Sequence, residues 1–145
     1  MQNSDDMATT APYRWILWTL LGVMTLSIPK VNAQGIRFCE TVNPDGTCVH
    51  EGTFFKIREG SDASVQVLVK STNALAGETA VLDIFRLNDI RKEVFESSVK
   101  VRISPEWLWF AQPLKFKHSG EYAVYAYDGV GRLIGAAKIN FEYNR

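Results

Sequence analysis

The chain has 145 residues, of which 46% are hydrophobic and 22% charged, and its 16 basic and 16 acidic side chains give a formal net charge of zero. This length fits one domain of ordinary size, and this composition excludes a largely disordered chain. Basic residues never occur more than two in a row, so we expect no nucleic-acid partner.

An apolar segment at Trp15–Ile28 dominates the N-terminal region. As a helix it is shorter than the ~30 Å hydrocarbon core, which favours the core of a signal peptide over a membrane span. Pro29 follows, and cleavage after Ala33 would make Gln34 the first residue of the mature protein. We therefore expect residues 1–33 to be a signal peptide, with a retained membrane anchor or a packed terminal helix as alternatives. The expected location is exported: periplasmic, cell-surface or secreted.

The leader before this segment is unusual for a signal peptide, which normally begins with positive charge. Asp5 and Asp6 are acidic, whereas Arg14 is the one basic residue before the apolar segment. A start at Met7 removes both acidic residues and leaves a short positive leader. Met1 and Met7 therefore both remain candidate starts.

The two cysteines, Cys39 and Cys48, flank a sequence with strong turn chemistry, Asn43-Pro44-Asp45-Gly46. Proline presets the backbone, aspartate accepts local hydrogen bonds, and glycine adopts positive φ without steric cost. The sequence therefore predicts a disulfide-closed hairpin at residues 34–51, which would persist in an oxidising compartment. A metal site with His50 is the alternative, but the paired CxxC spacing of structural zinc is absent.

From Gly52 onward, short runs of alternating apolar and polar residues are separated by turn residues. Such a period of two is typical of strands that are buried on one face. The predicted strands are Thr53–Ile57, Ala63–Ser71, Thr79–Leu87, Glu93–Ile103, Trp107–Lys117, Gly120–Asp128 and Leu133–Tyr143. Pro113 interrupts the fifth of them, which indicates an edge strand or a bulge.

The alternation also predicts which side chains face the core. In the fourth strand the inward residues should be Phe95, Val99, Val101 and Ile103. In the last strand they should be Ala137, Ile139, Phe141 and Tyr143. Strands with one apolar face each pair into stacked sheets, so we predict an all-β, seven-strand sandwich over residues 52–145, preceded by the disulfide hairpin. A closed barrel is the alternative.

The segment His118–Asp128 places a Ser-Gly turn before a strand with Tyr122 two residues ahead of Val124. It resembles the tyrosine corner of immunoglobulin-like sandwiches, in which the tyrosine hydroxyl hydrogen-bonds back to the backbone. The region from Thr53 to Tyr143 is thus similar to the broad immunoglobulin-like group of bacterial exported domains. Val124 stands where antibody domains carry a core cysteine, so the inter-sheet disulfide is absent. This fold hosts many unrelated functions and implies none by itself.

A search of the sequence for catalytic chemistry finds no recognisable constellation. The two histidines, His50 and His118, lack a companion at a known spacing, and no nucleophile motif, zinc motif or phosphate loop is present. We therefore expect no enzyme activity, no cofactor and no metal.

Four aromatic residues indicate a binding surface instead. Trp107 and Trp109 share one face of their strand, and Tyr125 and Tyr127 face away from the core in the next strand. If these two strands were neighbours, the four side chains would form an outward strip suited to a protein partner or to sugar rings. The alternative is that the N-terminal hairpin or residues 36–38 cover this face, which would then be a second small core.

These observations predict a non-enzymatic exported binding or structural component of a cell-envelope or extracellular protein assembly. A carbohydrate-binding module that uses the aromatic strip is the first alternative. The others are a periplasmic accessory subunit tethered to the membrane through residues 15–28, and a small periplasmic enzyme or metal-delivery protein that uses His50 or His118. Added strands at the edges of the sheets are a second possible mode of partner binding.

Overall fold

The computed structural model describes residues 35–144, so the predicted signal peptide, the Ala33–Gln34 cleavage site and the choice between Met1 and Met7 lie outside the described residues. Within residues 35–144 the secondary structure is entirely β, and no helix there could cross a membrane. The strands are β1 (Gly35–Val42), β2 (Cys48–Glu51), β3 (Phe54–Arg58), β4 (Ala63–Lys70), β5 (Thr79–Leu87), β6 (Glu93–Arg102), β7 (Trp109–Phe116), β8 (Gly120–Tyr127) and β9 (Leu133–Asn144).

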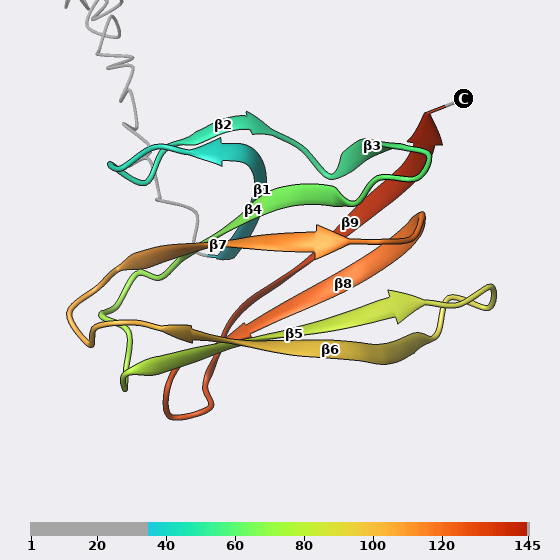
Figure 1. Ribbon diagram of the computed structural model, residues 1–145. Coiled ribbons are helices and arrows are strands. Elements are labelled where there is room, and N and C mark those ends of the chain that lie inside the picture. The colour runs from blue at the N-terminus through green and yellow to red at the C-terminus, as the bar shows by residue number, and fades with distance from the viewer. Residues whose placement is uncertain (1–34, 145) are drawn as a thin grey trace, which may run out of the picture. The chain divides into compact units, whose positions relative to one another are not determined.

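The strands form two sheets that pack face to face (Figure 1). One sheet has the order β2-β1-β4-β7 and the other the order β3-β9-β8-β5-β6. All pairings are antiparallel except that of β3 with β9, which is parallel. The predicted all-β, two-sheet architecture is confirmed, and each of the seven predicted strands overlaps an observed one.

The strand count and the place of the hairpin need correction. The first arm of the hairpin, β1, does not precede the sandwich but pairs with β4 from Gly35↔Lys70 to Cys39↔Gln66. Phe38 is 1% exposed and belongs to the shared core. The apolar side of β1 thus completes the four-stranded sheet, and the sandwich has nine strands, the seven predicted ones and the two arms of the hairpin. Burial of Phe38 explains why the hairpin is part of the fold.

The core lies between the two sheets and contains their alternating inward side chains. Val65, Val67 and Val69 of β4, which alternate along the strand, contribute from the first sheet. Phe116 of β7 meets Phe141 of β9 across the interface, with ring centroids 4.5 Å apart. The aromatic rings therefore join the two sheets directly.

Tyr122 also belongs to this cluster and holds the corner between β7 and β8. Its hydroxyl donates a hydrogen bond to the carbonyl oxygen of His118 at 2.9 Å. The centroids of the Tyr122 and Phe116 rings lie 4.8 Å apart, and Tyr122 as a whole is 1% exposed. Burial raises the pKa of the Tyr122 phenol above its usual value. This hydrogen bond is the one that the resemblance to immunoglobulin-like domains implies.

A β-bulge in β6 overturns one predicted inward residue. The pairing of β5 with β6 shifts from Ile84↔Ser97 to Phe85↔Phe95, which leaves Glu96 as the extra residue. An extra residue moves every side chain beyond it to the opposite face. Phe95 is accordingly 58% exposed and packs its ring against Phe85 on the outer face. Tyr143 was also predicted inward, but it is 43% exposed near the C-terminal end of β9.

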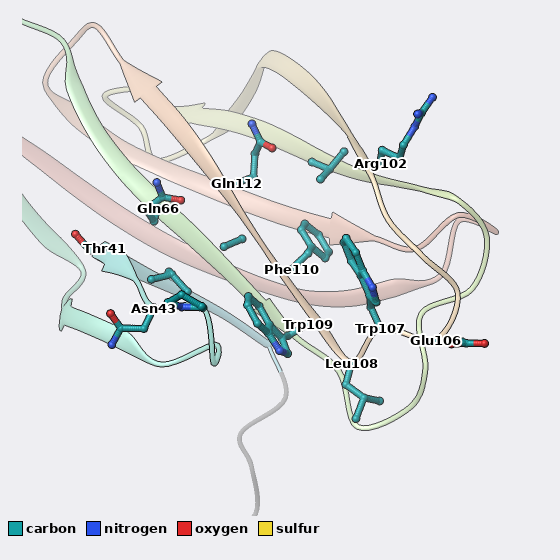
Figure 2. A pocket seen from close by; sticks show the side chains of 14 residues that line it. Thr41, Asn43, Gln66, Arg102, Glu106, Trp107, Leu108, Trp109, Phe110 and Gln112 are labelled. Atoms are coloured by element: carbon teal, nitrogen blue, oxygen red, sulfur yellow. The ribbon is translucent and has the colours of Figure 1, made fainter.

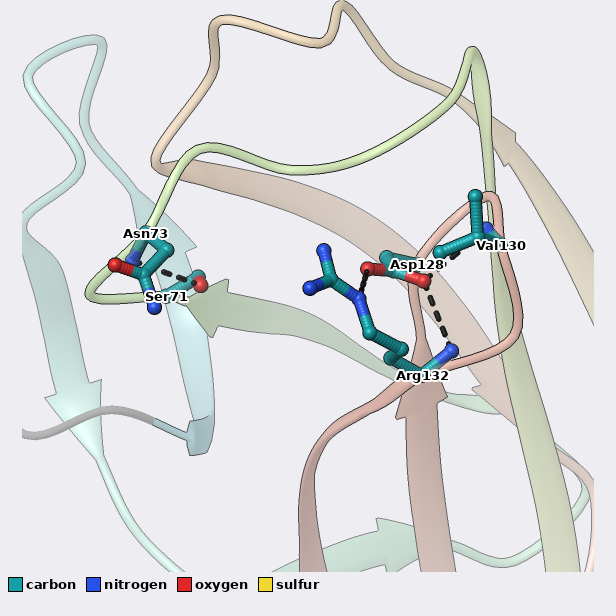
Figure 3. A network of polar contacts seen from close by, with 5 residues as sticks. All are labelled: Ser71, Asn73, Asp128, Val130 and Arg132. Carbon is teal, nitrogen blue, oxygen red and sulfur yellow. Dashed lines mark hydrogen bonds and ion pairs between the residues drawn. The ribbon is translucent and has the colours of Figure 1, made fainter.

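The turn between β8 and β9 is organised by Asp128, which is 5% exposed (Figure 3). Its carboxylate accepts hydrogen bonds from the backbone N–H groups of Val130 and Arg132, and from Arg132 Nε at 2.9 Å. Burial opposes ionisation of this group, but the hydrogen bonds from Arg132 and Val130 outweigh burial and lower the pKa of Asp128. The ionised carboxylate is therefore the form that the fold stabilises.

We expect Asp128→Asn to lower the free energy of unfolding by about 1–3 kcal/mol at pH 7, because the charged acceptor of these hydrogen bonds is lost. The folded-state pKa lies below the unfolded value of about 3.9, so the stabilisation is complete above that value and disappears as the pH falls through the folded-state pKa. Urea unfolding between pH 7 and pH 2 checks this. The difference in the free energy of unfolding between wild type and variant should vanish at acidic pH. A difference that stays constant would contradict the stabilising role of the ionised Asp128 carboxylate. Asp62→Asn, at an exposed position between β3 and β4, is the control.

Candidate functional site

A groove with a volume of about 910 Å³ runs around the edge strand β7 (Figure 2). Within residues 35–144, β7 pairs only with β4, so its other side is open. On one side of β7 the groove reaches the turn between β1 and β2, and on the other it reaches the end of β6. Trp107 and Trp109 both line it, and Trp107 is 46% exposed. The groove therefore offers aromatic surface to a ligand.

Trp109 is positioned by the hairpin turn that the sequence predicts. A Cβ atom on Gly46 would lie 2.7 Å from Cε2 of the Trp109 indole, so the turn rests directly on this ring. Gly46 also has φ of +79°, a conformation that glycine adopts without strain. Both observations require glycine at this position. The hairpin thus covers part of Trp109, in line with the predicted alternative of a covered face, while Trp107 remains accessible.

The turn itself is held by local hydrogen bonds. Gly46 N–H donates to the Asn43 carbonyl, and the Asp45 carboxylate accepts from the hydroxyl and the backbone N–H of Thr47. The hydroxyl and then the backbone hydrogen bond of Thr47 lower the pKa of Asp45. This ordered turn forms one wall of the groove.

Planar polar side chains complete the lining. The side chain of Gln66 makes no hydrogen bond to any residue between 35 and 144, whereas Gln112 donates from Nε2 to the Pro113 carbonyl at 3.2 Å and leaves its own side-chain carbonyl free. Arg102 and Glu106 bring one positive and one negative charge, and neither has an ion-pair partner among the described residues. Amides supply both donors and acceptors, so the groove can bind a ligand rich in hydroxyl or peptide groups without net charge.

The predicted strip of four aromatic residues is divided by the topology. β7, with Trp109, belongs to the four-stranded sheet, whereas β8, with Tyr125 and Tyr127, lies between β9 and β5 in the other sheet. Trp107 precedes β7 and stays with Trp109 in the groove. The condition that the two strands are neighbours is therefore not met, because the chain crosses from one sheet to the other between β7 and β8.

Tyr125 instead lies on the outer face of the five-stranded sheet. Its ring packs edge-on against Phe85 at 5.5 Å, and its hydroxyl donates to the Glu93 carboxylate at 2.9 Å. This hydrogen bond, with burial and the Glu93 charge, raises the pKa of Tyr125. Tyr127 lies further along the same face, next to Lys100 and Asp83 in a shallow hollow. These tyrosines belong to a surface separate from the tryptophan groove.

The histidines do not contribute to the groove. His50 Nδ1 lies 2.7 Å from Glu40 Oε2 on the exposed hairpin, and His118 offers its backbone carbonyl to Tyr122. Residues 35–144 contain no cluster of three or more His, Cys, Asp or Glu side chains that could hold a metal ion.

Cys39 and Cys48 form the predicted disulfide, with Cα atoms 5.5 Å apart. The bond joins β1 to β2 at the base of the turn that supports Trp109. A disulfide of this kind indicates an oxidising, non-cytoplasmic environment.

Several groove residues were missed by the sequence analysis. Asn43 was identified only as a turn residue, and Gln66 and Arg102 were given no role. These residues share only that they are polar and line the groove with Trp107 and Trp109, and the order of residues along the chain does not show that proximity. Pro113 as the mark of an edge strand was the sequence feature nearest to the site.

Comparison with known proteins places the architecture. No protein-family model and no curated protein matches the chain. An immunoglobulin-like protein from Pseudomonas aeruginosa superposes with a TM-score of 0.50 at 11% identity, over 76% of this chain and 94% of that one. The fold is immunoglobulin-like. At this identity the likeness establishes the immunoglobulin-like fold alone.

Two superoxide reductase (neelaredoxin) structures from Ignicoccus hospitalis are also similar, with TM-scores of 0.43 and 0.39 and identities of 14% and 17%. The matches cover 77% and 64% of this chain, and 81% and 76% of theirs. Likeness at this level carries no argument about chemistry, so the groove has to be interpreted from its own residues.

Proposed function

We propose that this immunoglobulin-like protein is a non-enzymatic exported binding domain, a structural or accessory component of a cell-envelope or extracellular assembly. The observation that supports this best is the groove at β7, which has a volume of about 910 Å³. Trp107 lines this groove and is 46% exposed. Half-exposed tryptophans at a concave site are typical anchors of binding interfaces. The disulfide agrees with export, and a tether through residues 15–28 would place the domain beside a membrane complex.

A carbohydrate ligand is the second candidate, and the side chains of the groove favour it specifically. Tryptophan faces stack on the apolar faces of sugar rings, and the amides of Asn43, Gln66 and Gln112 match the paired donors and acceptors of sugar hydroxyls. The charges of Arg102 and Glu106 offset each other, which suits a neutral glycan. The aromatic strip of the sequence analysis is thus replaced by a shorter aromatic pair with polar neighbours.

We expect Trp107→Ala to weaken ligand binding about tenfold without unfolding the domain, because the side chain is half exposed and forms part of the groove wall. The measurements are a glycan array with the full chain and, in cells, photo-crosslinking from a reactive side chain at position 107. Phe54→Ala, which removes an aromatic side chain that is 48% exposed on β3, is the matched control.

The two candidate functions give different results. A glycan hit that Trp107→Ala abolishes and Phe54→Ala preserves supports the carbohydrate-binding module. A protein adduct of defined mass at position 107, absent from a reactive side chain at the exposed Leu133, supports the assembly component. Binding that is unchanged in Trp107→Ala, or absent altogether, contradicts the groove as the site.

A further inference from the structure

Three loops meet at one end of the sandwich, and they join β4 to β5, β6 to β7 and β8 to β9 (Figure 1). The backbone N–H of Leu75 in the first loop donates to the Trp107 carbonyl in the second at 2.9 Å. The backbone N–H of Gly129 in the third loop donates to the Ala76 carbonyl in the first at 2.6 Å. These hydrogen bonds make the loops one surface, the loop end, which comprises residues 71–78, 103–108 and 128–133.

The loop end exposes large apolar side chains, all between 46% and 65% exposed: Trp107, Leu108, Val130 and Leu133. Exposed apolar side chains on adjoining loops mark a surface that contacts a protein or a membrane. The exposed charges beside them have both signs, with Glu78 and Glu106 against Arg132. Contact at the loop end should therefore depend on apolar burial and little on the charge of the partner.

The N-terminal part of the chain joins the domain at this same end. β1 begins at Gly35, which pairs with Lys70, the residue directly before the first loop. Gly35 also lies against β9, since a Cβ atom on Gly135 would be 2.8 Å from the Cα atom of Gly35. The apolar segment Trp15–Ile28 ends seven residues before Gly35, a stretch that covers at most about 25 Å when fully extended.

We propose that the loop end is a membrane-facing surface, and that residues 15–28 are retained as the anchor that brings it to the lipid. An apolar segment shorter than the hydrocarbon core draws its flanking residues towards the interface, which keeps the domain close to the bilayer. Tryptophan prefers the headgroup level, and Leu108, Val130 and Leu133 supply aliphatic side chains for the boundary with the acyl chains. The inference rests on the membrane tether named in the proposed function.

This orientation also places the groove at β7. Trp107 and Leu108 line the groove as well, so the groove opens at the edge of the membrane-facing surface. A ligand in the groove would therefore lie near the lipid headgroups, whichever of the two candidate classes it belongs to.

The test measures lipid contact at single positions of the full chain, reconstituted in phosphatidylcholine vesicles. Both native cysteines are in the disulfide, so one added cysteine carries an environment-sensitive fluorophore without competition. At Leu108→Cys or Val130→Cys the emission should shift to the blue, and lipids with a quencher on the acyl chain should reduce it. Ile90→Cys should show neither effect, because Ile90 is 80% exposed in the turn between β5 and β6, at the opposite end (Figure 1).

A further set of variants separates contact through the apolar side chains from proximity imposed by the tether alone. In the Leu108→Cys chain, Val130→Asp/Leu133→Asp should abolish the blue shift and the quenching, whereas Ile90→Asp should preserve both. High salt should change neither, since the contact is apolar. Circular dichroism of each variant excludes misfolding as the cause.

Four results would overturn the proposal. The first is an intact mass of the native protein from which residues 1–33 are missing. The second is a fluorophore at Val130→Cys that behaves like the one at Ile90→Cys. The third is a blue shift without lipid quenching, which would mean that a protein covers the loop end, and the fourth is lipid contact that persists in Val130→Asp/Leu133→Asp. None of them alters the glycan array or the crosslinking at position 107, so failure here is distinct from failure of the groove as a binding site.

Discussion

Phe141→Ala should lower the free energy of unfolding by about 3–5 kcal/mol, the largest effect expected of a single core truncation in this chain. Phe141 is fully buried, and its ring contacts three other aromatic rings, those of Phe55, Phe116 and Tyr122. Truncation removes apolar burial and leaves a cavity between the sheets that the rigid strands cannot close. Urea unfolding monitored by circular dichroism measures this change.

The matched control is Phe54→Ala, because Phe54 lies on the strand paired with β9 and is 48% exposed. Its loss should cost less than about 1 kcal/mol. Phe141→Leu should fall between the two, since it preserves most of the apolar volume. Equal effects of Phe141→Ala and Phe54→Ala would contradict the placement of Phe141 at the centre of the core.

The second large effect is expected from the disulfide. Cys39 and Cys48 are 9 residues apart in sequence. Closing a loop of this size lowers the conformational entropy of the unfolded chain and should thereby stabilise the fold by about 2–3 kcal/mol. The double variant Cys39→Ala/Cys48→Ala and wild type reduced with dithiothreitol should both lose this amount in urea unfolding. The sandwich should nevertheless remain folded, because β1 keeps its pairing with β4.

Comparison of these two samples separates the effect of losing the disulfide bond from the effect of losing the cysteine side chains. Equal losses assign the effect to the covalent link. A loss in the alanine variant alone would assign it to packing, since Cys39 is fully buried. No loss in either sample would contradict a structural role for the disulfide. The hairpin turn supports Trp109, so ligand binding measured on the reduced protein also tests whether the bond preorders the groove.

Much of the fold could be predicted from local pattern. The alternation of Val65, Val67 and Val69 identifies a strand and its buried face, because side chains alternate across a strand with a period of two. The Asn43–Gly46 turn between two cysteines predicts the hairpin and its bond, since turn chemistry is local. The interpretation of Tyr122 as a corner residue agrees with its hydrogen bond to His118, which is close to it in sequence.

The bulge at Glu96 shows where local pattern fails. The inward set predicted from Phe95 to Ile103 assumes one unbroken strand, yet the pairing with β5 shifts between Ile84 and Phe85 and turns Phe95 outward. A bulge arises from how two strands fit together in a twisted sheet, so the sequence of one strand carries little sign of it.

The candidate site shows the same limit more strongly. Trp107 and Trp109 were identified as exposed aromatics, but their assumed neighbours Tyr125 and Tyr127 belong to the other sheet. Their actual companions, Gln66 and the Asn43 turn, lie far before them in the sequence, on strands and turns that only the folded sheet brings together.

The sequence by itself thus determined which segments are strands, which faces are buried and where the cysteines close a loop, because each depends on residues within a few positions of one another. Only the tertiary structure decided which sheet each strand joins, that β1 completes the sandwich, and that a groove forms around β7. Strand order depends on the burial of all apolar faces together, and this sum over the whole chain cannot be read from any one segment.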